Sequence, residues 1–241
     1  MKSRVILSWS GGKDSALALH ELRKNGDYEV AALLTTITRD YDRICMHGVR
    51  TSLLEQQAKS LGLVLEKIFI SKNASNNEYE ARMREVLEKY QADGVCAVVF
   101  GDIFLEELKQ YRQEKLAQIG MDGLFPLWKR DTAELACAFI DLGFKAVVTC
   151  ADSNLLDSAL VGCTFDEQFL SMLPAGVDPC GENGEFHSFV SDGPIFQQQI
   201  PHTLGEVVLR DNGFYYCDLV PAGTAASQLQ TDKGPIPSRS V

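Results

Sequence analysis

The sequence contains no hydrophobic run long enough to cross a membrane. No unbroken apolar stretch is longer than Val95–Phe100, whereas a spanning helix needs about 20 such residues. Near the amino terminus, the apolar run Val5–Leu7 is too short for the core of a secretory signal. We therefore expect a soluble protein that is not exported and has no membrane partner.

Paired cysteine motifs are also missing. The chain has seven cysteines, an odd number, and no two of them are spaced as Cys-x-x-Cys. This pattern indicates neither a disulfide framework nor a zinc knuckle. The sequence thus favours a reducing, cytoplasmic location.

Basic residues are fewer than acidic ones. Lys and Arg number 23 against 33 Asp and Glu, which gives a formal net charge of −10. A protein whose main affinity comes from neutralising the phosphates of a polynucleotide carries the opposite excess. A local basic groove is an alternative, but the net charge disfavours a nucleic-acid partner.

The rest of the composition is that of an ordinary globular protein. Of the 241 residues, 45% are apolar and 23% are charged, close to the averages for soluble domains. This length has room for one large α/β domain or two smaller ones.

The first two thirds of the chain alternate β-branched apolar runs with amphipathic stretches, as βα units of a parallel sheet do. We expect strands at Arg4–Trp9, Val30–Thr36, Leu65–Ile70, Gly94–Gly101 and Lys145–Cys150. We expect helices at Asp14–Asn25, Val49–Leu61, Glu78–Tyr90, Leu105–Ile119 and Thr132–Leu142. The sequence predicts an α/β fold with a doubly wound, mostly parallel five-stranded sheet, formed by residues 1–150.

The pattern changes after residue 150. Short helices are expected at Asp152–Phe165 and Glu167–Leu173, and antiparallel strands at His187–Val190, Gly205–Leu209 and Phe214–Leu219. Residues 151–220 are therefore predicted to form a smaller, substrate-binding α+β segment. Residues 221–241 hold almost no large apolar side chain, so we expect a flexible tail.

The most informative segment is the loop Ser10-Gly11-Gly12-Lys13-Asp14-Ser15, which joins the first strand to the first helix. A glycine-rich turn at a helix amino terminus presents backbone N–H groups and the positive end of the helix dipole to a phosphate. Ser10 and Ser15 add hydroxyl groups, Lys13 adds a charge, and Asp14 could hold Mg²⁺ or orient the loop. The sequence predicts a phosphate site here.

Two other interpretations of this loop are weaker. It is not a Walker A motif, because Leu7 stands where that motif requires glycine and Asp14 where it requires Ser or Thr. A glycine pair can also serve only as a strand-to-helix turn. Six defined residues in a strand-turn-helix context favour the phosphate site.

The loop matches the S-G-G-x-D-S motif of the PP-loop, or N-type ATP pyrophosphatase, superfamily. Over about residues 5–220 the chain resembles the diphthine–ammonia ligase family, with blocks in the same order and spacing. These blocks are Gly101-Asp102-Ile103, Tyr111-Arg112, Pro126-Leu127-Trp128, Gly143-Phe144, residues 180–189 and residues 192–196. Ser188 departs from the pattern, where Thr is usual. The resemblance implies an adenine nucleotide alpha hydrolase-like fold.

The resemblance also implies an ATP-dependent ligase that forms an amide. In this superfamily the loop holds the β and γ phosphates of ATP, an acyl oxygen attacks the α phosphate, and pyrophosphate leaves. The acyl-adenylate then reacts with ammonia. Lys13, together with Mg²⁺ near Asp14, would stabilise the charge that grows on the leaving pyrophosphate.

Four further residues are predicted to line the active cleft. Asp102 follows a strand, where ligands collect in open α/β sheets, although an Asp in this place can also cap a helix. Arg112 could bind a carboxylate or phosphate, or lie on a solvated helix face. Glu182 and Glu185 flank glycines in a turn-rich block, and could act as bases for ammonia or bind a cationic substrate.

The resemblance places His47 near the nucleotide, because family members carry a similar element in a mobile loop. Trp128 and Phe186 are candidate neighbours of a quaternary ammonium group, with ordinary core packing as the alternative. His187 could relay a proton but is more often structural in this setting. Cys180 has no base at a defined spacing, so a small buried apolar role is favoured.

Three functions compete. The first is ligation of ammonia to diphthine on translation elongation factor two, as the family name implies, or to a different acyl substrate. The second is tRNA thiolation, which the absence of paired cysteines and of basic charge disfavours. The third is a nucleotide sensor that binds ATP or AMP without turnover. The sequence shows no glutaminase block, so free ammonia or a partner would supply the nitrogen, and the chain could form a homo-oligomer.

Overall fold

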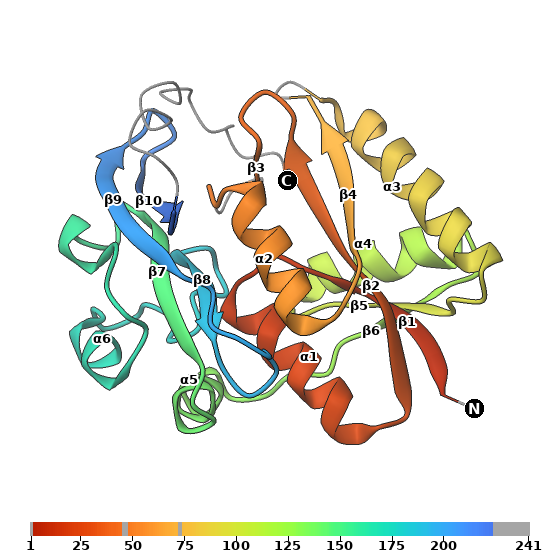
Figure 1. Cartoon of the computed structure of the whole chain (residues 1–241), viewed down its shortest axis with the longest axis horizontal. Coiled ribbons are helices and arrows are strands. Elements are labelled where there is room, and N and C mark those ends of the chain that lie inside the picture. Colours follow the sequence, from red (N-terminus) through yellow and green to blue (C-terminus); the bar gives the residue numbers. More distant parts are fainter. Residues whose placement is uncertain (1, 45–47, 72–73, 224–241) are drawn as a thin grey trace.

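The structure is a computed structural model that describes residues 2–44, 48–71 and 74–223. Its strands form two sheets, and Figure 1 shows helices α1 and α2 between them. The first sheet contains β1 (Ser3–Ser8), β2 (Tyr28–Thr38), β3 (Arg43–Ile44), β4 (Leu65–Ile70), β5 (Ala97–Val99) and β6 (Asp122–Leu124). The second contains β7 (Lys145–Asp152), β8 (Phe186–Asp192), β9 (His202–Leu209) and β10 (Phe214–Pro221).

The helices follow the predicted positions closely. They are α1 (Lys13–Asn25), α2 (Thr51–Leu61), α3 (Asn76–Ala92), α4 (Glu106–Ala117), α5 (Thr132–Asp141) and α6 (Glu167–Met172). Gly62 ends α2 with a positive φ of 69°, because glycine adopts the left-handed conformation without a steric penalty. No helix in the described ranges is long and apolar enough to cross a membrane.

The first sheet confirms the predicted fold class. Its strands follow the order β3-β2-β1-β5-β6, with β4 also paired to β2. All of these pairs are parallel except that between β2 and β3. Alternate residues of β1 point to opposite faces: Val5 and Leu7 join the core with α1 and α2, whereas Ile6 packs with residues of α3 and α4. Helices therefore cover both faces of a mostly parallel sheet.

One strand was assigned to the wrong sheet. Lys145–Cys150 was expected to be the fifth parallel strand, but it lies within β7, which pairs antiparallel with β8 and β10. The fifth parallel strand is β6, which pairs with β5. β6 is three residues long and contains a glycine, too short for a periodic signal, and an apolar run does not reveal its pairing partner. The expected boundary at residue 150 falls inside β7.

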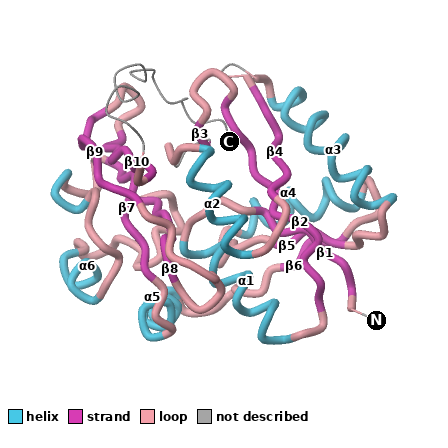
Figure 2. Tube along the Cα trace, in the orientation of Figure 1, coloured by secondary structure: helices cyan, strands magenta, loops and turns pink. Residues whose placement is uncertain are grey.

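The second sheet has the order β8-β7-β10-β9, and all of its pairs are antiparallel. Figure 2 shows its strands as a group separate from those of the first sheet. The predicted strands after residue 186 are confirmed, as is the short helix α6. The helix expected at Asp152–Phe165 is wrong, because this stretch holds only a 3₁₀ turn at Ser158–Leu160. Its start is an Asx turn, in which the Asn154 amide donates to Asp152 Oδ1.

A single large core joins the two sheets. It contains Leu17 of α1, Leu53 of α2, Phe139 of α5 and Phe189 of β8, and each of these side chains is at most 3% exposed. Because α1 and α2 are packed on both sides, the start of α1 is held from both sheets. Of the predicted tail at residues 221–241, Pro221 is the last residue of β10, and residues 224–241 lie outside the described residues.

Candidate active site

The predicted phosphate loop lies where the two sheets meet. β1 ends at Ser8, and α1 begins at Lys13. The Val190 amide of β8 donates to the Gly11 carbonyl at 2.8 Å, and the Lys13 amide donates to Ser188 Oγ at 3.2 Å. The loop thus follows a strand of the first sheet and is hydrogen-bonded to a strand of the second.

The glycines of the loop are required by protein packing. Gly11 has a φ of 77°, and a Cβ there would lie 2.7 Å from Gln57 Oε1 and from Leu54 Cδ2. A Cβ at Gly12 would lie 3.0 Å from the Ser188 carbonyl. A side chain at either position would push away α2 or β8, so both glycines allow the loop to enter this crowded junction.

The two serines of the loop lie together. Their Oγ atoms are 3.3 Å apart, the Gly12 amide donates to Ser10 Oγ at 3.2 Å, and Ser15 Oγ donates to the Gly12 carbonyl at 2.9 Å. The N-cap residue of α1, Gly12, has no side chain to cap the helix. Two hydroxyls and the first-turn amides of α1 therefore share one small region, an arrangement suited to an anion.

Lys13 points into the protein interior. Its side chain is 4% exposed, and its Nζ donates to both carboxylate oxygens of Asp14, at 2.9 and 2.8 Å, and to the Cys180 carbonyl. The rings of Phe165 and Phe186 lie 6.0 and 5.5 Å from Nζ. Burial alone would lower the pKa of Lys13, but the Asp14 carboxylate raises it above its ordinary value. The lysine thus stays charged and links the loop to the block that contains Cys180.

Asp102 and Arg112 form an ion pair beside this loop. Arg112 Nε lies 2.8 Å from Asp102 Oδ2, and the guanidinium lies 4.2 Å from the ring centre of Phe100. Burial raises the pKa of Asp102, the Arg112 charge opposes this shift, and the Asp14 carboxylate adds to it. A Cβ at Gly101 would lie 2.8 Å from the Asp14 carbonyl carbon, so the end of β5 approaches the start of α1 closely.

Glu182 comes to the same place from the second half of the chain. Its Oε1 accepts a hydrogen bond from the Ile103 amide at 2.7 Å. Burial, together with the charges of Asp14 and Asp102, raises the pKa of Glu182 to about 7, against the lowering effect of that amide. Three carboxylates from three separate segments are therefore close enough to disturb one another's ionisation.

The Glu185 side chain is buried within the turn formed by residues 178–185. Only 4% of it is exposed, and its Oε1 accepts from the Asp178 amide at 3.1 Å and from Asn183 Nδ2 at 2.9 Å. Its Oε2 has no hydrogen-bond partner within the described part of the chain. These contacts brace the turn that carries Glu182.

Four further residues were considered for the site: His47, Phe186, Trp128 and Cys180. His47 lies outside the described residues. Phe186 is 1% exposed and belongs to the core, and one face of the Trp128 ring is covered by Lys109 Nζ, 4.1 Å from the ring centre. Burial raises the pKa of the Cys180 thiol to about 12, which keeps it protonated and argues against a nucleophilic role.

The sequence prediction missed two polar residues at the loop. Ser188 was noted only as a departure from a pattern, and Gln57 was not noticed. Gln57 is fully buried, on the face of α2 that also buries Leu53, Leu54 and Ala58. A glutamine on the apolar face of a helical pattern was the available signal, because a buried amide needs hydrogen-bond partners.

Mg²⁺ has no preformed protein site in the described ranges. No three His, Cys, Asp or Glu residues there converge on one point. Both carboxylate oxygens of Asp14, the predicted ligand, accept hydrogen bonds from Lys13. This arrangement does not fit a resident magnesium ion.

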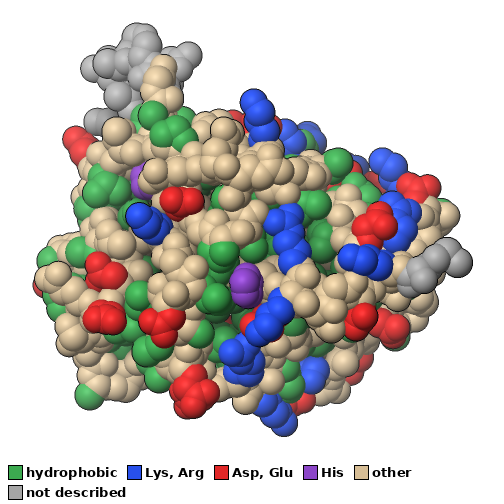
Figure 3. Space-filling model, turned by 60° about the horizontal axis from the view of Figure 1, so that its bottom comes forward, with side chains coloured by type: hydrophobic (Ala, Val, Ile, Leu, Met, Phe, Trp, Pro, Cys, Tyr) green, Lys and Arg blue, Asp and Glu red, His purple; other side chains and the backbone are tan. Residues whose placement is uncertain are grey.

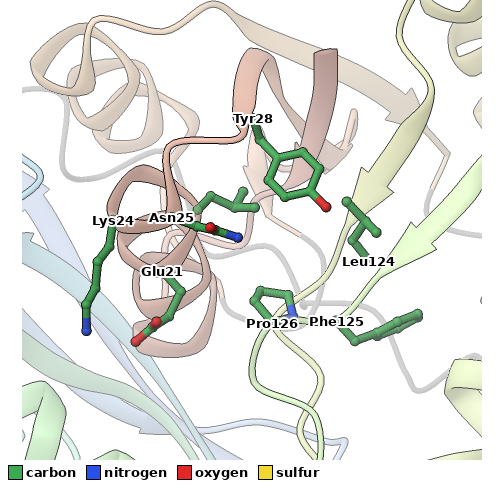
Figure 4. A pocket seen from close by; sticks show the side chains of 8 residues that line it. Glu21, Lys24, Asn25, Tyr28, Leu124, Phe125 and Pro126 are labelled. Atoms are coloured by element: carbon green, nitrogen blue, oxygen red, sulfur yellow. The ribbon is translucent and has the colours of Figure 1, made fainter. Parts of the chain in front are cut away.

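A separate cavity of about 560 Å³ opens at the carboxyl end of α1, away from the loop. Figure 4 shows the Tyr28 ring pointing into the space between α1 and the segment Leu124–Pro126, with Glu21 and Lys24 on the α1 side. None of its lining residues was predicted to take part in the chemistry, and none belongs to the loop.

Comparison with known families identifies the class of protein. Residues 1–122 match the model of the diphthamide synthase N-terminal domain, and residues 131–218 match that of the diphthamide synthase C-terminal domain. The chain therefore belongs to the diphthamide synthase family.

Among individual proteins, the chain is similar to several named diphthine–ammonia ligase. It is 24% identical to one from Saccharomyces cerevisiae over 98% of this chain and 40% of that protein. It is 25% identical to one from Danio rerio over 87% of this chain and 90% of that protein. A third, from Schizosaccharomyces pombe, is 27% identical over 87% of this chain and 38% of its own length. The chain thus spans less than half the length of the two yeast relatives but most of the zebrafish one.

Proposed function

We propose that this chain is an ATP-dependent ligase that joins ammonia to a carboxyl group and releases AMP and pyrophosphate. The observation that carries the proposal is the convergence of three segments. The loop at the start of α1 meets Asp102, which follows β5, and Glu182, whose carboxylate accepts from the Ile103 amide at 2.7 Å. An anion site thus lies beside carboxylates that can bind and deprotonate a cation.

In this proposal residues 10–15 bind the phosphates of ATP. The first-turn amides of α1 and the hydroxyls of Ser10 and Ser15 would face the phosphate oxygens. Lys13 contributes from the interior, where its ammonium fixes the Asp14 carboxylate. Arg112 holds Asp102 in the same way, and His47 would come near the nucleotide. Magnesium would arrive with ATP, because the described residues form no site of their own for it.

The proposed chemistry has two steps. An oxygen of the substrate carboxylate attacks the α phosphorus, the bond to the β-phosphate oxygen breaks, and pyrophosphate leaves. Ammonia then attacks the acyl carbon, AMP leaves, and the nitrogen loses a proton. Amide donors fixed at the start of α1 stabilise the charge on the departing pyrophosphate without needing to reorganise.

Glu182 is the group best suited to take the proton. Ammonia in water is mostly ammonium at neutral pH, so a base must remove a proton before or during attack. The pKa of Glu182, raised to about 7, places it between its two protonation states at that pH. Glu185 acts indirectly, by bracing the turn that carries Glu182.

The names of the relatives suggest the substrate. If this chain shares their reaction, the carboxyl group is that of diphthine on elongation factor two, and the product is its amide. Diphthine carries a quaternary ammonium group, and the carboxylates of Asp14, Asp102 and Glu182 would attract it. Acidic and basic side chains both occur across the face shown in Figure 3. The formal charge of −10 also favours a cationic substrate over a polynucleotide.

The domain division is part of the same proposal. The ATP-binding unit comprises the first sheet with its helices and ends before β7. The second sheet, with the turn at residues 178–185, forms the unit that binds the acyl substrate.

The test is to measure AMP and pyrophosphate made from ATP, with and without ammonia, in the presence of diphthine-containing elongation factor two or simpler acyl substrates. We expect both products in equal amounts, with amide formed only when ammonia is present. Turnover with another carboxylate alone would change the substrate and keep the reaction. Tight binding of ATP with no turnover under any condition would support the nucleotide sensor instead.

A further inference from the structure

We propose that Gln57 of α2 is a positioning residue for the nucleotide loop: its side-chain amide fixes the orientation of the Gly11 peptide and thereby the affinity for ATP. The inference rests on the proposed function only in naming ATP as the ligand. Gln57 is 0% exposed, and it lies 46 residues from Gly11 in the chain.

Both polar atoms of the Gln57 side-chain amide form hydrogen bonds. Its Nε2 donates to the Gly11 carbonyl at 3.0 Å and to the Val190 carbonyl at 2.6 Å. Its Oε1 accepts from the indole N–H of Trp9 at 2.9 Å. Two carbonyls need donors and one N–H needs an acceptor, so these partners assign the orientation of the amide.

These partners lie on two segments that are far apart in the chain. Trp9 follows β1, Gly11 lies in the loop, and Val190 lies in β8. The Val190 amide also donates to the Gly11 carbonyl at 2.8 Å, so two donors hold that single oxygen. The Gly11 peptide plane is therefore fixed, and with it the position of the loop ahead of the first turn of α1.

The helix that carries Gln57 is itself anchored. Ser60 Oγ donates to the Gln198 carbonyl at 2.6 Å, and the Gln197 amide donates to the Ser60 carbonyl at 3.0 Å. These contacts tie α2 to the segment between β8 and β9. Gln57 thus has a rigid base, which a positioning residue needs.

The test variant is Gln57→Glu, which has the same shape but replaces both N–H donors with an oxygen that faces two carbonyls. We expect the dissociation constant for ATP to rise about tenfold or more, since leaving buried carbonyls unpaired beside a charge weakens the fixed loop. Turnover at saturating ATP should fall much less. Calorimetric titration with ATP and steady-state kinetics measure the two effects.

Two control variants separate positioning from loss of stability. Gln56→Glu adds the same charge on the same helix at a half-buried position and should bind ATP within about twofold of the unaltered protein. Leu53→Val weakens the core beside Gln57 without touching the loop. If Leu53→Val lowers ATP affinity as much as Gln57→Glu does at equal melting temperature, the inference is overturned.

A pH series gives a readout that a purely structural role would not move. A protonated glutamate regains one donor, so the defect of Gln57→Glu relative to the unaltered protein should shrink as the pH falls from 8 to 6. A defect that stays constant over this range counts against the inference.

Amide hydrogen exchange of residues 9–13 in the protein without ATP tests the same inference independently of the reaction. Gln57→Glu should speed this exchange at least tenfold more than Gln56→Glu does, and equal rates would overturn the inference. If the unaltered protein fails to bind ATP, the proposed function is wrong, and the exchange experiment still decides whether Gln57 fixes the loop.

Discussion

The two sheets contribute to the site in different ways. The parallel sheet leads directly into the loop, because β1 ends just before it. The end of β5 lies beside the loop. The antiparallel sheet holds the loop once it is there, through Ser188 and Val190 of β8. The loop therefore belongs to the first sheet by chain order and to the second by hydrogen bonding. An isolated first sheet would retain the motif without the contacts that fix it.

The two connections between the sheets also differ. At the loop, the buried Lys13 ammonium joins Asp14 to the Cys180 carbonyl. Within β10, Asp218 binds Arg43 at 2.8 Å and Arg50 at 2.6 Å, and its side chain is 27% exposed. The connection at the loop includes groups that we propose act on the substrate, whereas the Asp218 connection includes none of them. Substitutions at each should separate activity from stability.

The largest effect is expected from Asp14→Asn. Turnover to AMP should fall roughly 100-fold or more, because the fixed charge beside the phosphates is lost. The free energy of unfolding should fall by about 3 kcal/mol, since a buried ammonium loses its carboxylate. The double variant Lys13→Met, Asp14→Asn removes both charges and should regain much of the stability while remaining inactive. Urea denaturation and an AMP assay measure these outcomes, and a double variant less stable than Asp14→Asn would contradict the pairing.

The next effect concerns Glu182 and depends on pH. Its pKa in the folded protein is raised from 4.5 to about 7, so the folded state holds this proton more tightly than the unfolded chain does. Stability should therefore fall as the pH rises through this interval, by up to about 3 kcal/mol. Glu182→Gln should be more stable than the unaltered protein at pH 8 and equal to it near pH 4. Urea midpoints at both pH values test this, and a stability difference independent of pH would refute the raised pKa.

A smaller effect is expected from Asp218→Asn. Burial alone would raise the pKa of Asp218, but Arg50 and Arg43 lower it below its ordinary value. Ionised Asp218 thus stabilises the fold, and replacing it should cost about 2 kcal/mol at pH 7, less than for a fully buried pair. This cost should vanish as the pH falls below the lowered pKa. ATP turnover at low temperature should stay near that of the unaltered protein, and a loss comparable to that of Asp14→Asn would break the distinction between the two connections.

The smallest effect is expected from Ser188→Ala, which removes the acceptor for the Lys13 amide. Stability should fall by about 1 kcal/mol, and ATP affinity a few-fold, because one buried donor is left unpaired. Ser188→Thr keeps the hydroxyl and should retain function. Ser191→Ala, also buried and on the same strand, serves as the control. Equal ATP affinity in Ser188→Ala and Ser191→Ala would show that β8 does not hold the loop through this hydroxyl.

The local features could be predicted from the sequence because they depend on near neighbours. The helices α1 to α5 follow periodic apolar patterns, and the loop at residues 10–15 follows from glycines placed between a strand and a helix. Asp102 and Glu182 were predicted near the site, and the geometry brings them to the loop. The predicted homo-oligomer and the role of His47 stay predictions.

The errors concern partners that are distant in the chain. β7 was expected in the first sheet because an apolar run looks the same whichever strand it pairs with. The Lys13 ammonium contacts the Cys180 carbonyl, 167 residues away, and no local sequence pattern predicts this contact. The position of Gln57 on the apolar face of α2 signals a buried amide, but the sequence does not show which distant groups that amide binds.

The sequence by itself determined where strands and helices form, where the anion-binding turn lies, and which family the chain resembles. The first two depend on backbone preferences and on apolar spacing within short stretches of the chain, whereas the resemblance depends on motif blocks distributed along it. Only the tertiary structure decided which sheet β7 joins, that Lys13 points inward, and that Gln57 and Ser188 hold the loop. Such contacts exist only after the two sheets pack together, because a buried hydrogen bond or ion pair needs both of its groups removed from water at the same place.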